Sequence, residues 1–503
     1  MQVYYICLVL WAVFESVIST ACIFGWAQLL EILHSERYFA SYCETNEADS
    51  NKTISQLKNR TSSISDDVSD TCARQDSLLI LAYTLSAFTS FVSIFLGGKF
   101  LDVFGFRKAR VLSCFIYLLA GGTMFMSTYD LHELLFPGLL LTVIGGGFFM
   151  AVLVKVCGVL PQRRYMAVSI INGAIDSSAV VLLVFKLCFN AGVSFRSIII
   201  VYYVFVVGQG MLFTFTIFPK DLPVPDDIEE DVRESNSSTN ENTEQFTCEN
   251  AFISREVQEN DKEQIQDKTS LSSIIKSTKF VMHTCFVSIA SLRSFSVIGM
   301  INSLLRRLAD DFEEVDYYLT ILGIIQFCGI ILSFVPGFLL DWAPAGRHQN
   351  FSIILSFILT GLISILLTVG LLIPFLEFQV FNFFLYTLLR CFLYSTHGSF
   401  IMKEFPLYHA GALFGLSLLV SAVVSLSQIP MFALMEGPYG GDPTCVNVGL
   451  LVFQILVMIH PLYLWRHTGD EENKYNYCTN LSLTNKENVR LNSDNHCDSE
   501  NKL

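Results

Sequence analysis

Long apolar runs recur along the whole chain and are separated by shorter polar stretches. Each run has about 18 to 26 residues, the length that a helix needs to cross roughly 30 Å of hydrocarbon. The pattern predicts an all-α integral membrane protein with twelve transmembrane helices. The runs lie near residues 3–28, 77–97, 111–128, 134–158, 165–189, 197–218, 280–303, 317–338, 351–373, 380–402, 410–435 and 445–465.

The polar segments divide these runs into two sets of six. Residues 219–279 open with prolines and acidic residues and continue as a tract rich in Ser, Asn and Glu, which is typical of a disordered linker. We therefore expect an N-terminal six-helix bundle (1–218), a cytosolic linker (219–279), a C-terminal six-helix bundle (280–465) and a disordered cytosolic tail (466–503).

A short motif follows the second run of each set. Gly98 and Asp102 are four positions apart, and Gly337 and Asp341 repeat the pair 239 positions later. We interpret the repeat as a duplicated gating motif, in which glycine permits close helix contact and aspartate accepts hydrogen bonds at a helix N-terminus. We expect the charges of the first copy to close the cytosolic side. The motif comprises Gly98, Asp102, Gly105, Arg107, Lys108, Arg110, Gly337, Asp341 and Arg347.

Composition supports the membrane assignment and excludes several functions. The chain is 52% hydrophobic and 16% charged, whereas soluble proteins are about a quarter charged. The net charge of −14 lies mostly in the polar segments, so nucleic-acid binding is disfavoured. The sequence lacks HExxH, Walker A and GxSxG motifs and any Cys/His cluster with metal-ligand spacing. We therefore expect no enzyme activity, no metal and no cofactor.

Basic residues in the short loops set the orientation. They fall on one side of the twelve runs, which places both termini in the cytosol. The loop 29–76 is then extracellular, and its sequons at Asn51 and Asn59 are predicted to be glycosylated. A disulfide between Cys43 and Cys72 is a hypothesis for the same oxidising compartment.

Polar residues inside the runs are the candidates for a substrate cavity, because a charge in the membrane costs roughly 3 kcal/mol or more. The alternative for each is an interhelical hydrogen bond worth about 1 kcal/mol. Asp176 or Glu15 could carry a proton, or stay ionised beside an arginine. We expect Lys186 to reach the outer interface. The candidates are Glu15, Trp26, Asn172, Asp176, Arg293, Asn302, Gln326, Arg390, His397 and Gln428.

Two six-helix sets, a long linker and a repeated motif resemble the organisation of the major facilitator superfamily. This resemblance implies two pseudo-symmetric bundles that rock around a site near the midplane. Several strings are more specific and resemble solute carrier family 43. They are Phe24-Gly25-Trp26, residues 172–178 (NGAIDSS), residues 301–305 (INSLL), residues 390–394 (RCFLY), residues 413–416 (LFGL), residues 421–426 (SAVVSL) and Gln428-Ile429-Pro430.

The resemblance is strongest to the nucleobase-carrying branch of that family. It implies sodium-independent, facilitative passage of purine bases such as adenine, guanine and hypoxanthine across the plasma membrane, with an effect on fatty-acid flux. It implies the lipid bilayer and a small-molecule substrate as partners, and no obligatory protein partner. Sister members carry large neutral amino acids, which is the first alternative. A non-transporting membrane regulator with the same fold is the second.

The chemistry of the two substrate classes differs, but the polar residues fit both. A purine is flat and uncharged, so its cavity needs aromatic walls and amide partners, and the chain has 43 Phe for the walls. The candidate partners for its edge are Trp26, Asn172, Asn302, Gln326 and Gln428. An amino acid needs separate partners for its carboxylate and its ammonium group, which Arg390 and either Asp176 or Glu15 could supply.

Overall fold

A computed structural model of the chain describes residues 2–42, 73–156, 164–217, 271–342, 350–405, 407–438 and 442–467. Every regular element in these ranges is a helix. The predicted sequons at Asn51 and Asn59, the cysteines Cys43 and Cys72, and Arg347 of the gating motif lie outside the described residues. Most of the predicted linker and the tail from residue 468 also lie outside them.

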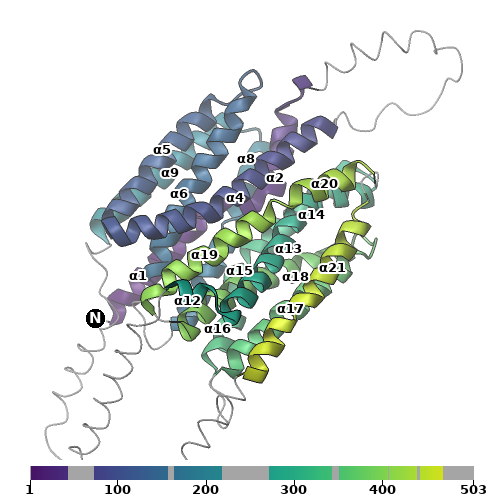
Figure 1. Cartoon of the computed structure of the whole chain (residues 1–503). Coiled ribbons are helices and arrows are strands. Elements are labelled where there is room, and N and C mark those ends of the chain that lie inside the picture. The colour runs from purple at the N-terminus through teal and green to yellow at the C-terminus, as the bar shows by residue number, and fades with distance from the viewer. Residues whose placement is uncertain are drawn as a thin grey trace, which may run out of the picture.

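The first half of the chain forms one group of helices, coloured purple to blue in Figure 1. Its first run is split by a short 3-10 helix, η1 (Cys22–Gly25). A second 3-10 helix, η2 (His132–Leu134), precedes α6. The α-helices are α1 (Gln2–Ser19), α2 (Trp26–Ser35), α4 (Ala73–Phe104), α5 (Phe106–Met126), α6 (Leu135–Val156), α7 (Arg164–Ser177), α8 (Val180–Asn190) and α9 (Phe195–Thr216).

The second half forms the other group, coloured green to yellow in Figure 1. The short helix α12 (Leu271–Ile275) lies within the predicted linker, and its Ile274 packs into the core of this half, so the end of that segment is folded. The remaining helices are α13 (Thr278–Leu308), α14 (Phe312–Phe327), α15 (Gly329–Leu332), α16 (Phe334–Asp341), α17 (Phe351–Leu371), α18 (Phe378–Glu404), α19 (Leu407–Ser425), α20 (Gln428–Glu436) and α21 (Thr444–Val457).

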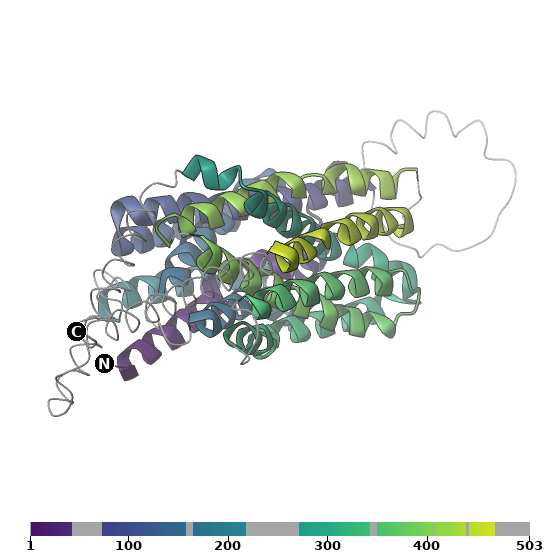
Figure 2. The ribbon, with the colours of Figure 1, turned by 60° about the horizontal axis from the view of Figure 1, so that its bottom comes forward.

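The helices account for all twelve predicted spans. Nine described helical stretches are long and apolar enough to cross a membrane, and two bent pairs each make one more span. The remaining predicted run, 380–402, corresponds to α18, which has 27 residues but carries several polar side chains. Figure 2 shows that the long helices of both halves run along a common direction. We call the end of the molecule opposite the N-terminus the far end (Figure 1).

Two of the spans bend where the halves meet. The first span bends by 49° between α1 and α2, and the span made by α14 to α16 bends by 43°. A broken helix leaves backbone groups without intrahelical partners. Ser177 of the first half satisfies two such groups in the second half, because its Oγ donates to the carbonyl of Phe327 at 2.9 Å and accepts from the N–H of Ile330 at 3.1 Å.

The two halves share one continuous apolar core. Residues of α1 to α9 and of α13, α14, α18 and α19 belong to the same buried cluster. α4 runs beside α19, and α7 packs against α15, α16 and α18. A Cβ at Gly173 of α7 would overlap the Ser333 side chain and approach the carbonyl oxygen of Gly329 at 2.8 Å. Gly173 therefore permits the close contact of α7 with the second half.

Gly173→Ala is expected to lower the melting temperature of the purified protein, because overpacking a tight helix contact costs about 1 to 3 kcal/mol. Gly98→Ala is the matched control, since a Cβ at Gly98 meets nothing within 4 Å. In that helix interior alanine is favoured over glycine by about 0.5 to 1 kcal/mol. A Gly173→Ala protein that melts at or above the Gly98→Ala temperature would contradict this account.

Candidate substrate site

A buried ion pair joins the two halves near the middle of the molecule. Arg390 of α18 donates from Nε to Oδ1 of Asp176, on α7, at 2.9 Å, and its Nη2 donates to the same oxygen. Its Nη1 donates to the hydroxyl of Tyr386 at 2.9 Å. Both charged side chains are at most 3% exposed. Two of the predicted candidates therefore meet across the boundary between the halves, and each neutralises the other.

Aromatic rings from both halves surround this pair. The Phe24 ring centroid lies 3.3 Å from the guanidinium carbon of Arg390, a favourable cation–π contact. Phe24 lies 5.8 Å from Phe295, Phe295 lies 5.3 Å from Phe91, and Phe91 lies 6.5 Å from Tyr394, all between ring centroids. Trp26 and Tyr83 form a further ring pair at 5.6 Å, and the Tyr83 hydroxyl donates to the Phe295 carbonyl. We call Phe24, Trp26, Tyr83, Phe91, Phe295 and Tyr394 the central aromatic cage.

Two amide side chains cross from the second half to the backbone of the cage. Gln326 of α14 donates to the Phe24 carbonyl at 3.2 Å, and Asn302 of α13 donates to the Ala27 carbonyl at 3.4 Å. The amide oxygens of both residues and the indole N–H of Trp26 are buried and have no hydrogen-bond partner in the described part of the chain. Buried polar groups are rarely left unpaired, so these atoms are suited to a polar ligand.

A cluster of three charged side chains joins the two halves at the far end. Lys186 of α8 contacts Glu31 of α2 at 2.8 Å and Asp316 of α14 at 2.7 Å. Nearby, Gln28 donates to the Leu319 carbonyl at 3.0 Å. We expected Lys186 to reach the outer interface, but only 2% of its side chain is exposed. This side chain instead links the first half to the second.

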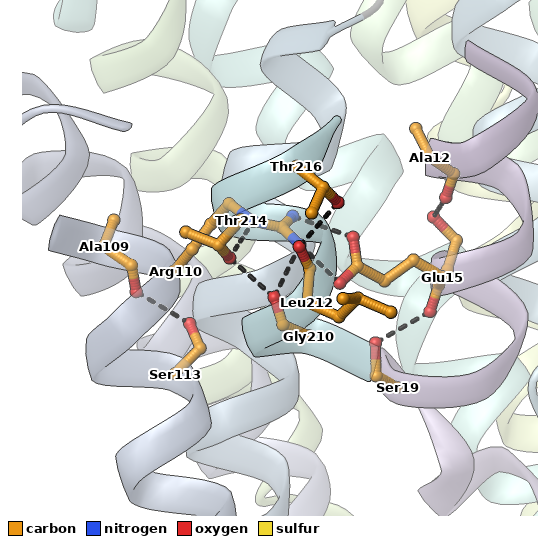
Figure 3. Close-up of polar contacts among 11 residues, drawn as sticks. Ala12, Glu15, Ser19, Ala109, Arg110, Ser113, Gly210, Leu212, Thr214 and Thr216 are labelled. Atoms are coloured by element: carbon orange, nitrogen blue, oxygen red, sulfur yellow. Dashed lines mark hydrogen bonds and ion pairs between the residues drawn. The ribbon is translucent and has the colours of Figure 1, made fainter. Parts of the chain in front are cut away.

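Glu15 lies inside the first half, where its partner is Arg110. Arg110 donates from Nη1 to Glu15 Oε2 at 2.7 Å and from Nη2 to Oε1 at 2.6 Å, and its Nε donates to Thr214 at 2.9 Å. Figure 3 shows Arg110 reaching from α5 between Glu15 of α1 and Thr214 of α9. Both charged side chains are fully buried. This position corrects two expectations, because Arg110 is not at the surface and Glu15 does not face the second half.

The remaining gating-motif residues differ in packing and exposure between the two copies of the motif. Gly105 has φ of 83°, so the turn between α4 and α5 requires a glycine there. Gly98 has open space around it, which contradicts its expected helix contact, whereas Gly337 packs against Met166 of α7. Arg107 is half-buried, and Lys108 and Asp341 are exposed. The Asp102 side chain is not described, so closure of the cytosolic side by the charges of the first copy stays a prediction.

Three further candidates lie within the second half, away from the central pair. His397 contacts His283 at 2.8 Å and Ser417 at 3.2 Å. Arg293 donates to Asn447 at 2.8 Å. Gln428 at the start of α20 donates to the Ser425 carbonyl, three residues before it, at 2.9 Å. These contacts lie between or within helices of one half.

The structure thus brings together five of the ten predicted candidates at the boundary between the halves. Asn172 is buried on α7 one turn before Asp176. Sequence reasoning did not include the phenylalanines and tyrosines of the cage among the cavity candidates, because the chain has 43 Phe and a long apolar run does not show which rings face inward. The five candidates are Trp26, Asp176, Asn302, Gln326 and Arg390.

Comparisons with known proteins agree with this arrangement. The family model of the Major Facilitator Superfamily matches residues 68–427. Equilibrative nucleobase transporter 1 of Bos taurus is 30% identical over 474 residues, which cover 90% of this chain and 94% of that protein. Large neutral amino acids transporter small subunit 3 of Homo sapiens is 24% identical over 533 residues, which cover 92% of this chain and 94% of that protein.

Solved structures share the fold. The proton:xylose symporter XylE bound to 6-bromo-6-deoxy-D-glucose superposes with a TM-score of 0.60, at 12% identity, over 93% of this chain and 96% of that one. A POT family transporter in complex with 5-aminolevulinic acid gives a TM-score of 0.56, also at 12% identity. These matches confirm the predicted fold class.

Glu15→Gln is expected to destabilise the protein by about 3 to 5 kcal/mol, because it leaves Arg110 buried without a counter-charge. Urea unfolding in mild detergent measures the loss. Replacing both residues by leucine should recover much of it, since no charge then remains buried. If Glu15→Gln loses substrate binding but keeps its stability, Glu15 contributes to the substrate cavity and the structural account of it is wrong.

Asp316→Asn is expected to loosen the far end, because Lys186 keeps Glu31 but loses its partner in the second half. At about 1 kcal/mol for a partly exposed pair, the open population should rise roughly fivefold. The readout is labelling of an Ala27→Cys variant by a thiol reagent, corrected for the native cysteines. Glu313→Gln, an exposed carboxylate on the same helix, is the control. Equal labelling of the two variants would show that the Lys186 contact does not hold the far end closed.

Proposed function

The chain belongs to the major facilitator superfamily, and we propose that it is a facilitative transporter of purine nucleobases that works by alternating access. It is a multi-pass membrane transporter and not an enzyme. The substrate, the sodium independence and the location in the plasma membrane, with both termini cytosolic, are parts of the proposal.

The central ion pair is the observation that carries the choice of substrate. An amino acid needs a cation for its carboxylate and a separate anion for its ammonium group. Arg390 and Asp176 engage each other, and Glu15 engages Arg110 in the first half. The charges that would bind a zwitterion are therefore already neutralised, and the remaining contacts suit an uncharged molecule.

The surroundings of the pair match the chemistry of a purine. The central aromatic cage offers flat apolar faces, on which a planar heterocycle stacks well. The Trp26 indole N–H is a hydrogen-bond donor, and the amide oxygens of Asn302 and Gln326 are acceptors, which complement the mixed edge of a nucleobase. Because these groups come from both halves, a bound base would contact each half.

Alternating access needs contacts that can break at either end while the centre stays joined. At the far end the halves meet through Lys186, Gln28 and the amide of Asn302. Toward the other end they meet through Gly173 and Gly337 of the tight α7 contact. We propose that the halves rock about the level of Arg390, which would open the cage first to one side and then to the other.

Transport of large neutral amino acids is the second candidate, and the relative of that name supports it. In that mechanism the substrate carboxylate would displace Asp176 from Arg390, and Asp176 would receive the ammonium group. The exchange leaves neither Arg390 nor Asp176 buried without an opposite charge, so it is physically reasonable. It requires the central pair to separate during each cycle.

Parallel uptake measurements test the choice of substrate. Cells with low endogenous uptake that express the chain should take up radiolabelled adenine saturably, with the same initial rate in the presence and absence of sodium, and should not take up leucine. Leucine uptake alone would favour the second candidate. If neither substrate enters while the protein is at the cell surface, the proposal fails.

Asn302→Ala is expected to raise the KM for adenine about fivefold to tenfold, because removing one hydrogen bond to a ligand costs about 1 to 1.5 kcal/mol. The matched control is Ser303→Ala, since Ser303 is the next residue on α13 and is exposed. An unchanged KM in Asn302→Ala would remove that side chain from the substrate site.

A further inference from the structure

One buried arginine differs from every other buried cation in the described residues. Four basic side chains there are at most 2% exposed: Arg110, Lys186, Arg293 and Arg390. Three of them contact carboxylates at 2.8 Å or less, as described above. Arg293 has no carboxylate partner in the ranges that the structure describes. A buried charge normally has a counter-charge, so this exception needs a physical explanation.

The contacts of Arg293 leave much of its guanidinium unused. Nη1 donates to Oδ1 of Asn447, on α21, at 2.8 Å. The Nε–H is buried and has no hydrogen-bond partner within the described chain. A guanidinium has five N–H donors, and an amide oxygen supplies no charge. Among the described residues, nothing therefore compensates the positive charge of Arg293.

Arg293 borders a small cavity of about 10 Å³ between α13, α17 and α21. Arg293 and Asn447 are its polar lining residues, and Asn447 also brings an amide NH₂ donor to it. The other walls are apolar, formed by Val297, Met300, Ile301, Leu304, Leu371 and Pro443. The cavity thus combines one cation and amide donors with walls that offer no competing negative charge.

The start of α21 adds to the positive potential at this place. Pro443 occupies the N-cap position of this 14-residue helix, and Asn447 lies in its first turns. The N-terminus of a helix carries a partial positive charge. The nearest acidic residue in the sequence, Asp442, is exposed and does not line the cavity; it contacts Arg307 at 3.4 Å and accepts from the N–H of Thr444.

We propose that this cavity binds a small monovalent inorganic anion such as chloride, held by the guanidinium of Arg293 and the amide of Asn447. The cavity volume of about 10 Å³ gives room for about one water-sized particle, so the site is suited to a single small ion and not to a nucleobase. The anion supplies the counter-charge that the chain provides for the other buried cations. The residues that line this cavity include none of the central aromatic cage, so the two sites are separate.

Binding of this kind stabilises the folded protein in proportion to the logarithm of anion concentration. The test uses the purified full-length chain in detergent, with chloride replacing gluconate at constant ionic strength. The melting temperature of the wild type should rise by about 1 °C or more for each tenfold increase in chloride above its Kd. Bromide should act in the same way.

Variants separate the site from a general salt effect. Arg293→Gln should abolish the dependence on chloride, and Asn447→Ala should shift it to higher concentration. Lys279→Gln, which removes a partly exposed cation of the same helix, should keep the wild-type response. A wild type that is insensitive to chloride, or an Arg293→Gln protein that keeps the full response, would overturn the proposal.

A structural measurement covers the case in which Arg293→Gln does not fold. Crystals of the wild type grown in bromide should give an anomalous peak beside Nε of Arg293 and the amide of Asn447. A bromide-stabilised protein without that peak would overturn the assignment. Neither measurement involves transport, so failure here and failure of the proposed function are distinguishable.

Discussion

The contact between Asp176 and Arg390 constrains the whole molecule, because it places opposite charges from the two halves in a dry interior. Each side chain is at most 3% exposed, and the Phe24 ring covers the guanidinium face. Removing one partner from such a pair typically costs 3 to 5 kcal/mol, since the other charge stays buried alone. The two halves must therefore remain close at this level. The aromatic rings around the pair exclude water, which strengthens the attraction further.

Close contact at the centre depends on small residues and bent helices around it. The bend between α14 and α15 frees backbone groups that Ser177 satisfies from the other half. Gly173 permits α7 to approach that bend, where any larger side chain would overlap Ser333. Bends and small residues together create a surface on each half that fits the other closely.

Much of the fold could be predicted from the sequence, because the length of an apolar run is a strong signal in a membrane protein. All twelve predicted runs coincide with helices or bent helix pairs. The first span bends at η1, and its second part, α2, extends to Ser35, beyond the predicted end at 28. A membrane segment predicted from hydropathy carries no information about such a bend.

The site could be predicted only in part, because hydropathy identifies buried polar residues but not their partners. Asp176 and Arg390 are 214 positions apart, and Glu15 and Arg110 are 95 apart. All four are costly in a membrane for the same reason, but one pair lies at the boundary and the other inside a single half. The prediction for Lys186 is wrong for a different reason, since a long basic side chain near a helix end normally reaches the membrane interface. Its two carboxylate partners come from separate helices, and nothing local in the sequence marks them.

The distribution of charges also indicates how the halves can separate. Lys186 has one carboxylate in its own half and one in the other. When the far end opens, it can release Asp316 and keep Glu31, so no buried charge loses its last partner. Among the described residues Arg390 has no second carboxylate, because the one that it contacts, Asp176, belongs to the opposite half. In the proposed cycle, the motion that costs less free energy therefore breaks the contact of Lys186 with Asp316 and keeps the central pair, which supports a pivot at the level of Arg390. A substrate that leaves this pair intact can cross with less reorganisation than one that must divide it, and an uncharged nucleobase meets that condition better than a zwitterion does.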